Sequence, residues 1–209
     1  MILGGALLVF AYIVGSIPTG LWLGMMVAGI DVRTVGSRRM GATNVQRSLG
    51  VKLGVAVLLI DIAKGVTAVL VTRAVSGSDR LAAVAGVVAV CGHIWPVFAN
   101  FRGGRGAATA AGAVLALAPL SLAVVALVMI GTVAVTRYVS LGSIAGALVV
   151  GPAVAFFLPL VHGSDAAVPA SIVIAALVIY KHSDNIQRLR HGTESKLGAR
   201  AVTAPSTPR

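Results

Sequence analysis

The sequence predicts an all-α polytopic membrane protein, and three observations support this fold class. Hydrophobic residues make up 57% of the 209 positions and charged residues only 11%, whereas a soluble domain of this length needs far more polar surface. The mean hydropathy is +0.96, and the apolar residues form long stretches that short polar loops separate. Alanine, valine and glycine dominate these stretches, which suits helices that pack closely through small side chains in lipid.

A helix needs about 20 mainly apolar residues to cross a bilayer. Stretches of roughly this length predict spans at about 5–28, 53–75, 81–99, 119–135, 141–161 and 167–181. A further apolar stretch at about 107–118 is shorter and ends at Pro119. We expect residues 1–198 to form a single transmembrane catalytic domain. The Ala/Thr/Pro/Ser-rich tail at 199–209 is expected to be disordered and cytoplasmic.

The positions of the positive charges predict the orientation of the chain. Fourteen of the 17 Lys and Arg residues lie in the segments 29–52, 101–106, Arg137 and 181–209. The positive-inside rule places all four segments in the cytoplasm and the N-terminus outside. This arrangement requires 107–118 and 119–135 to be two separate helices. It therefore gives about seven transmembrane helices, some short or broken, with a cytoplasmic C-terminus.

Composition also excludes several classes of function. The net charge of +11 is spread over short loops between apolar stretches, so it indicates membrane topology and anion binding, and we expect no nucleic-acid partner. Cys91 is the one cysteine, which excludes an intrachain disulfide and a cysteine metal site. No His, Asp and Glu residues recur at metal-ligand spacing, so we expect no metal and no cofactor.

The first basic segment contains the polar run 36–47, in which glycines flank hydroxyl, amide and guanidinium groups just before a predicted helix. Backbone N–H groups in such a turn at a helix N-terminus form an anion site. Arg47 follows Asn44 by three residues, shares its helical face and can bind a phosphate through two N–H groups. The alternative is a positively charged loop that only fixes the topology, and on this segment alone the two interpretations are equally supported.

The second segment ends in Arg102-Gly103-Gly104-Arg105-Gly106. The glycines allow a ligand to approach the backbone closely, and the two guanidinium groups supply positive charge. The run is not a P-loop, because the Gly-x4-Gly-Lys-Ser/Thr spacing is absent. His93, at the end of the preceding span, is more often a structural residue in such a position than a catalytic one.

The third segment covers 181–194, where His182, Asn185 and Arg188 recur every three residues and so share a helical face. The alternative interpretation is an amphipathic helix that rests on anionic lipid. Within the second predicted span, Asp61 and Lys64 are three residues apart. Charges inside a membrane span indicate function by default, but a structural ion pair that supports the cytoplasmic site is equally compatible with the spacing.

Together these segments resemble the bacterial acyl-phosphate:glycerol-3-phosphate acyltransferase family (PlsY type). The resemblance covers about residues 12–198, and five motifs carry it in order. They are Gly15-Ser16-Ile17-Pro18, Gly36-Ser37…Gly41-Ala42-Thr43-Asn44…Arg47, Asp61-x-x-Lys64-Gly65, Gly92-His93-x-x-Pro96-Val97-Phe98…Gly103-Gly104-x-Gly106 and His182-x-x-Asn185-Ile186…Gly192-Thr193-Glu194. Any one of these motifs is weakly specific, but five in sequence are strongly specific.

The resemblance implies an enzyme of the bacterial inner membrane, with a seven-helix fold and a cytoplasmic site. Such an enzyme transfers a fatty acyl group from acyl phosphate to the sn-1 hydroxyl of glycerol 3-phosphate. The products are 1-acyl-glycerol 3-phosphate (lysophosphatidic acid) and phosphate, in phospholipid biosynthesis. The implied partners are the two substrates and the lipid bilayer, and the enzyme that produces acyl phosphate is a further candidate.

The resemblance also implies roles for particular residues. The catalytic residues, which orient the phosphates and the hydroxyl, are Ser37, Arg47, Arg105, His182 and Asn185. The substrate-binding residues are Gly41, Thr43, Asn44, His93, Arg102, Gly103 and Gly104. The supporting residues are Asp61, Lys64 and Glu194.

The chain departs from the family pattern in two places. Arg39-Met40 stands where Asn-Pro is usual, and Arg102 and Arg105 replace two lysines. The second change keeps the charge but replaces a compact ammonium by a planar guanidinium.

The chemistry favours direct attack of the glycerol hydroxyl on acyl phosphate, because the phosphate is already a good leaving group. Positioning of both reactants is expected to contribute more than a general base. A transporter for a small phosphorylated metabolite and a structural scaffold are the alternatives. Against the transporter, the polar residues lie at the predicted rim rather than at the midplane. The other class of glycerol-phosphate acyltransferases uses His-x4-Asp, which none of the four histidines matches.

Overall fold

The computed structural model describes residues 2–161 and 164–198, and every regular element within these ranges is helical. The predicted tail at 199–209 lies outside the described residues. In chain order the elements are α1 (Ile2–Ser16), α2 (Thr19–Ala28), α3 (Ala42–Leu49), α4 (Val51–Ser76), α5 (Asp79–Ile94), η1 (Val97–Ala99), α6 (Ala107–Leu117), α7 (Pro119–Thr136), α8 (Val139–Phe157), η2 (Leu158–Val161), α9 (Ala167–Lys181) and α10 (Ser183–Arg190).

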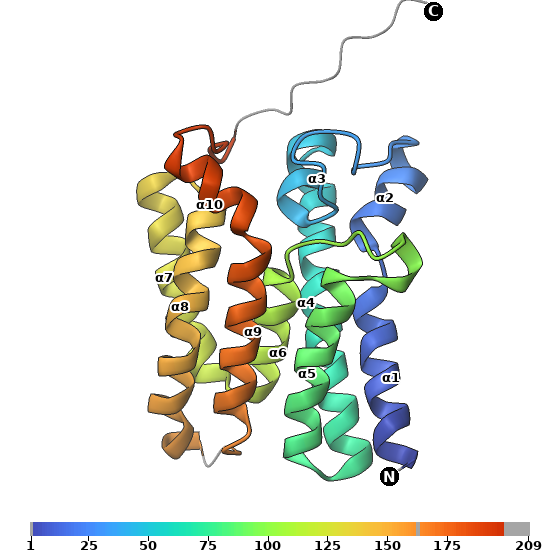
Figure 1. Ribbon diagram of the computed structural model, residues 1–209, viewed down its shortest axis with the longest axis vertical. Coiled ribbons are helices and arrows are strands. Elements are labelled where there is room, and N and C mark those ends of the chain that lie inside the picture. Colours follow the sequence, from blue (N-terminus) through green and yellow to red (C-terminus); the bar gives the residue numbers. More distant parts are fainter. Residues whose placement is uncertain (1, 162–163, 199–209) are drawn as a thin grey trace, which may run out of the picture.

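The long helices run roughly parallel to one another in a single bundle (Figure 1). Within the described residues, five stretches are long and apolar enough to cross a membrane, and the pair α9–α10, bent by 54°, is a sixth if it is counted as one span. Helix α6 is apolar but has only 11 residues. The predicted all-α membrane fold is confirmed. The predicted count of seven spans and their orientation stay predictions.

The first predicted span is broken in the structure. Proline lacks a backbone N–H and cannot continue a helix, and the chain accordingly leaves α1 after Ser16 and starts α2 at Thr19, on either side of Pro18. The Lys64 ammonium on α4 donates a hydrogen bond of 2.5 Å to the carbonyl oxygen of Ile17 at this break. In a hydrocarbon environment such a partner matters, because water is not there to supply one.

Small residues bring the helices close together. The α carbon of Gly15 on α1 faces the backbone of Ala89 on α5, and a Cβ there would overlap the Ala89 carbonyl. Gly92 on α5 meets the backbone of Tyr12 in the same way. Helix α7 lies at the outside of the bundle, where Ser121 is its one buried residue among those described.

The basic segments gather at one end of the bundle. Figure 1 shows α3, α10 and the junction of α7 and α8 at the end opposite the N-terminus. Polar contacts join these segments: the Leu197 N–H donates to the Arg137 carbonyl over 2.6 Å, and the Arg47 guanidinium donates to the Ser195 carbonyl over 2.9 Å. The turn between α4 and α5, which Arg73 and Asp79 flank, lies at the other end.

Candidate active site

The centre of the basic end is the carboxylate of Asp184, in the first turn of α10. Its Oδ2 atom lies 3.2 Å from Arg39, 3.2 Å from Arg105 and 3.6 Å from Arg188, measured to guanidinium nitrogens. A carboxylate in the first turn and arginines in the last turn both suit the dipole of a short helix. Three segments far apart in the sequence therefore meet at one oxygen atom.

A second carboxylate, Glu194, fixes the segment that follows α10. Its Oε1 atom accepts hydrogen bonds of 2.7 Å from Ser140 and Asn185, and its Oε2 atom accepts one of 2.7 Å from Arg188. The Glu194 side chain is only 6% exposed. We call residues 193–197 the strap, because they cross from α10 to the start of α8 and, through the Ser195 carbonyl, to Arg47 on α3.

The arginines of this end have unused hydrogen-bonding capacity. The Nε–H groups of Arg47 and Arg105 are buried and have no partner among the described residues. Burial lowers the pKa of both guanidinium groups, while Glu194 and Asp184 respectively oppose that effect. Buried donors without partners are costly, so both arginines are suited to bind an anion.

The carboxylates are too few to neutralise the cations around them. Burial acts to raise the pKa of Asp184, but the surrounding guanidinium groups, Arg105 foremost, outweigh it and hold the pKa below its ordinary value. The cluster contains five cations against the two carboxylates Asp184 and Glu194, which leaves three net positive charges. The cations are Arg39, Arg47, Arg105, Lys181 and Arg188.

Asn44 shapes the first loop of the site. Its amide nitrogen lies within 3.2 Å of the carbonyls of Val32, Val35 and Arg39, and its Oδ1 atom accepts the Ser37 N–H at 2.7 Å. The side chain is buried and all its polar atoms are used within the loop. Asn44 therefore fixes the path of the backbone on which Ser37 lies.

The N-terminus of α3 has no side-chain cap. Gly41 occupies the N-cap and no side chain caps the first turn. A Cβ at Gly41 would meet nothing within 4 Å, so there is free space beside the backbone. Thr43 lies half-buried in this first turn. The arrangement leaves room for an anion near the positive end of the helix dipole.

The Gly103–Gly104 turn packs directly on His93. The Gly104 N–H donates to the His93 carbonyl over 3.2 Å, and any side chain at Gly104 would overlap the imidazole ring. The buried ring lies 3.1 Å from the hydroxyl of Thr109 on α6 and 3.8 Å from Asp61 on α4. His93 is thus enclosed beneath the turn, and it supports the backbone that presents Arg105.

Asp61 and Lys64 form a closed ion pair beneath that turn. The two charged atoms are 2.5 Å apart, and each side chain is 3% exposed. The pair connects α4 to the break before Pro18 through the Ile17 carbonyl and to α5 through His93. Of the two interpretations that the sequence left open, the geometry favours structural support of the site.

His182 marks the bend between α9 and α10 and is 3% exposed. Its Nδ1 atom lies 2.8 Å from the Val178 carbonyl, which can only accept, so the proton of the neutral ring is on Nδ1 and Nε2 is an acceptor. Burial lowers the pKa of His182 to about 4. The ring is therefore neutral near pH 7 and presents one lone pair.

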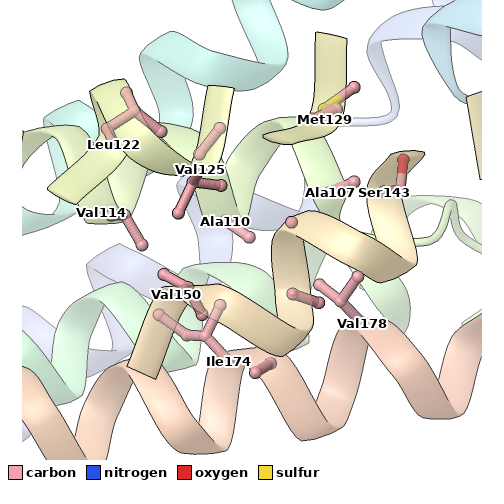
Figure 2. Close-up of a pocket in the computed structure, with 14 residues that line it drawn as sticks. Ala107, Ala110, Val114, Leu122, Val125, Met129, Ser143, Val150, Ile174 and Val178 are labelled. Atoms are coloured by element: carbon pink, nitrogen blue, oxygen red, sulfur yellow. The ribbon is translucent and has the colours of Figure 1, made fainter. Parts of the chain in front are cut away.

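An apolar groove begins next to this cluster and runs between α6, α7, α8 and α9 (Figure 2). The space along the groove is about 440 Å³ when the part that is open to the surroundings is included. At one end it is lined by Ala107, two residues after Arg105, and by Val178, whose carbonyl holds His182. The remaining lining residues are Ala110, Ala111, Val114, Leu122, Val125, Met129, Ser143, Gly146, Ala147, Val150, Ile174 and Ala175.

Contacts link four of the sequence-predicted site residues, Arg47, Arg105, Asn185 and Glu194, through the strap and Asp184. Asn185 and Glu194 are hydrogen-bonded, Asp184 links Arg105 to α10, and the strap links Arg47 to Glu194. Arg102 differs from these residues, because it is exposed and makes no ion pair with any residue in the ranges described. Within those ranges, no three His, Cys, Asp or Glu side chains lie close enough to hold a metal ion.

Asp184 and Ser140 are among the contributors to the cluster that sequence reasoning missed. Asp184 had a usable signal, because it lies four residues before Arg188, a spacing that favours an ion pair on a helix. Ser140 had none, because it meets Glu194 across 54 residues of sequence and only the fold brings them together.

The fold is a helix bundle of the membrane type, with surplus positive charge at one end and an apolar groove beside that charge. These features define a class of protein that can hold an amphiphile by its anionic head and its apolar tail. Comparison with known sequences gives the family. A model described as glycerol-3-phosphate acyltransferase matches residues 5–192. The chain belongs to this family.

Individual relatives agree over nearly the whole chain. The glycerol-3-phosphate acyltransferase of Geobacter sulfurreducens is 47% identical over 189 residues, which are 90% of this chain and 95% of that protein. The protein of the same name from Trichlorobacter lovleyi is 48% identical over the same shares of the two chains.

Two solved structures share the fold. A crystal structure of PlsY (YgiH), an integral membrane glycerol 3-phosphate acyltransferase, in its glycerol 3-phosphate form is 39% identical, with a TM-score of 0.84 over 93% of this chain and 96% of that one. The lysophosphatidic acid form of PlsY is 37% identical, with a TM-score of 0.80 over 94% and 96% of the two chains.

Proposed function

We propose that this protein transfers a fatty acyl group from acyl phosphate to the sn-1 hydroxyl of glycerol 3-phosphate, giving lysophosphatidic acid and inorganic phosphate. The observation that supports this function most directly is the continuity of the cation cluster with the apolar groove. Arg105 and Ala107 are two residues apart, so a phosphate at Arg105 and an acyl chain along α6 belong to one molecule of donor. Family membership supports the same reaction.

The reaction needs no acyl-enzyme intermediate. The hydroxyl oxygen of glycerol 3-phosphate attacks the acyl carbon, a carbon–oxygen ester bond forms, and the bond between that carbon and the phosphate oxygen breaks. The electron pair leaves with the phosphate, and the hydroxyl proton passes to a phosphate oxygen. The two phosphates together bring about three to four negative charges near neutral pH, and the surplus of positive charge at the site offsets their repulsion.

His182 is proposed to orient the attacking hydroxyl. Its Nε2 atom is free to accept a hydrogen bond because Nδ1–H donates to Val178. With a pKa of about 4 the ring is a weak base, which favours a role in alignment over removal of the proton. Holding two reactants in line contributes up to about 7–11 kcal/mol, compared with about 10²–10⁴-fold in rate for one general base.

The cytoplasmic side of the bacterial inner membrane is the proposed location of the site. The gathering of basic segments at the end opposite the N-terminus supports this orientation through the positive-inside rule. Both the enzyme's soluble substrate and the proposed partner that produces acyl phosphate then have access to the same face.

The test uses the purified protein in detergent, with glycerol 3-phosphate and one of three donors: acyl phosphate, acyl-CoA or acyl carrier protein. We expect one inorganic phosphate released per lysophosphatidic acid formed, only with acyl phosphate, and acylation at the sn-1 position by mass spectrometry. Equal rates with all three donors would contradict the donor assignment. No product with any donor would reject the proposed function.

The groove has its own test. Ala175→Phe places a ring in the groove, whereas Ala176→Phe, on the adjacent exposed position of α9, leaves the groove open. We expect Ala175→Phe to reduce the rate with a 16-carbon donor by about tenfold and the rate with an 8-carbon donor much less, since each buried CH₂ contributes about 0.8 kcal/mol. An equal loss of rate with both donors, or in both variants, would show that the acyl chain does not bind in this groove.

A further inference from the structure

We propose that Arg39 is a further phosphate-binding residue of this site, that it binds glycerol 3-phosphate, and that Asp184 holds it in position. The inference rests on the proposed function. Arg39 belongs to neither set of residues that the family resemblance implies, and it stands at a position where the resemblance implies asparagine.

The first observation is the convergence of Arg39 and Arg105. One terminal nitrogen of each lies 3.2 Å from the same oxygen, Asp184 Oδ2, so the two nitrogens are at most twice 3.2 Å, or 6.4 Å, apart. Phosphate oxygens accept charge-assisted hydrogen bonds from guanidinium groups as carboxylate oxygens do. Asp184 therefore marks a place that is already arranged for an oxyanion.

The second observation is that Asp184 leaves Arg39 incompletely neutralised. One carboxylate oxygen serves three guanidinium groups, and the other nearby carboxylate, Glu194, is used by Arg188, Asn185 and Ser140. A phosphate carries about −1.5 to −2 charges at pH 7 and has more acceptor positions than a carboxylate. The phosphate of glycerol 3-phosphate can therefore satisfy Arg39 better than the shared Asp184 oxygen does.

The third observation is the difference in position between the two arginines. The Arg105 side chain is 18% exposed and lies on the chain beside the groove, whereas the Arg39 side chain is 35% exposed on the loop that precedes α3. The donor phosphate is tied to the groove by its acyl chain, so it belongs with Arg105. Arg39, nearer to solvent, is placed to meet the water-soluble substrate.

The test compares two adjacent arginines. Arg39→Asn and Arg38→Asn each remove one positive charge from the same loop, but only Arg39 contacts Asp184, and Arg38 is exposed. Asparagine also suits position 38, where the backbone is left-handed with φ 55°. We expect Arg39→Asn to raise the KM for glycerol 3-phosphate about tenfold, because a charge-assisted hydrogen bond is lost, and to change kcat and the KM for acyl phosphate less than threefold. Arg38→Asn should change each constant less than twofold, and Arg39→Lys should recover part of the loss.

A double-mutant cycle separates phosphate binding from a purely structural ion pair. Asp184→Asn removes the partner of Arg39 while keeping the size of the side chain. If Arg39 binds phosphate, Arg39→Asn raises the KM about tenfold in the Asp184→Asn protein as well. If Arg39 serves only Asp184, the second change has no further effect. That outcome, or an unchanged KM in the single Arg39→Asn variant with an unchanged unfolding midpoint, would overturn the inference.

Calorimetric titration of the donor-free protein with glycerol 3-phosphate distinguishes failure of this inference from failure of the proposed function. Suppose that the parent protein turns over no acyl donor but that Arg39→Asn binds glycerol 3-phosphate more weakly than the parent does. The proposed reaction would then be rejected, and the contact of Arg39 with phosphate would be retained. If instead the parent protein turns over normally, and the parent and Arg39→Asn bind glycerol 3-phosphate equally well, the reaction would be retained and Arg39 would be removed from the site.

Discussion

Two groups of charged residues in this molecule differ in balance. Asp61 and Lys64 form one pair inside the helices, 2.5 Å apart and each 3% exposed, and the second partner of Lys64 is the Ile17 carbonyl. The cluster around Asp184 lies at the end of the bundle, where five cations surround two carboxylates. The internal pair is electrically neutral, and the terminal cluster is not.

This difference distinguishes charged residues that support the fold, Asp61 and Lys64, from charged residues that we propose bind substrate. An unbalanced charge inside hydrocarbon is too costly to retain, so the internal pair is complete without a ligand. At the end of the bundle, water and ions screen the surplus, which allows a set of cations to be held together until an anionic substrate arrives. The surplus of positive charge is therefore the feature on which the proposed substrate site depends.

The largest expected effect comes from breaking the internal pair. Lys64→Met leaves the Asp61 carboxylate buried without its partner, and we expect a loss of about 3–5 kcal/mol in unfolding free energy. The unfolding midpoint in detergent, followed by tryptophan fluorescence, measures this loss.

The matched control is the double variant Asp61→Leu with Lys64→Met, which removes both charges and should be more stable than Lys64→Met alone. If the double variant is the less stable of the two, the pair is not a balanced structural unit. Structural support would then not account for Asp61 and Lys64.

Removing a cation from the terminal cluster should have a different signature. Arg105→Ala is expected to reduce kcat/KM by about 10²–10³-fold, in the range seen for loss of one charge-stabilising donor, while the unfolding midpoint changes little. Arg105→Lys keeps the charge and should retain much more activity. Near-normal turnover in Arg105→Ala would remove this residue from the site.

The pH dependence of the unfolding free energy tests whether the buried His182 ring is neutral in the folded protein. Its pKa is about 4 in the folded protein and 6.5 as an unperturbed group, so the unfolded chain binds the proton more tightly. The stabilisation from the neutral ring is complete above about pH 6.5 and is lost as the pH falls toward 4. Between pH 7 and pH 5 we expect a loss of about 1–2 kcal/mol, seen as a lower unfolding midpoint.

His182→Gln should remove this part of the pH dependence, and His191→Gln, at an exposed position after α10, should leave it in place. A fall in the midpoint that is the same in all three proteins would show that the His182 ring is not the group responsible. The acidic groups of the cluster do not interfere, because their pKa values lie below this pH window.

The smallest expected effect is that of salt. Raising the ionic strength from about 0.01 M to 1 M shortens the screening length from about 30 Å to 3 Å. We expect the KM for glycerol 3-phosphate to rise several-fold, because the terminal cluster is partly exposed. The Asp61–Lys64 pair is shielded from salt, so the loss of stability in Lys64→Met should be the same at both ionic strengths.

The fold class could be read from the sequence because it depends on composition and on the lengths of apolar runs. The short helix α6 was visible as an apolar run that ends at Pro119, whereas the break at Pro18 lies inside a stretch, about 5–28, that was predicted as one span. The partner of the broken end was not visible, since Lys64 lies 47 residues away from Ile17 in the sequence. Only the packing of α4 against α1 brings them together.

The candidate site depends on local and on distant contacts. The glycines at 103 and 104 predicted close approach of a ligand to the backbone, which stays a prediction, and the structure shows that His93 already lies that close to them. The engagement of Asn44 with three carbonyls of its own loop could not be inferred, because a polar side chain near a predicted helix start is equally compatible with ligand binding. The meeting of Arg39 with Asp184 spans 145 residues and has no local signature.

The strap has a consequence for biogenesis. Chains are synthesised from the N-terminus, so Arg39, Arg47 and Arg105 leave the ribosome long before the groups that hold them. Asp184 holds Arg39 and Arg105, and the Ser195 carbonyl holds Arg47. During insertion the early loops carry positive charge without internal partners, which is when such charge is most effective in retaining a loop on its side of the membrane. In the proposed orientation the same arginines guide the nascent chain first, and Asp184 and the strap later complete the cluster that we propose as the substrate site.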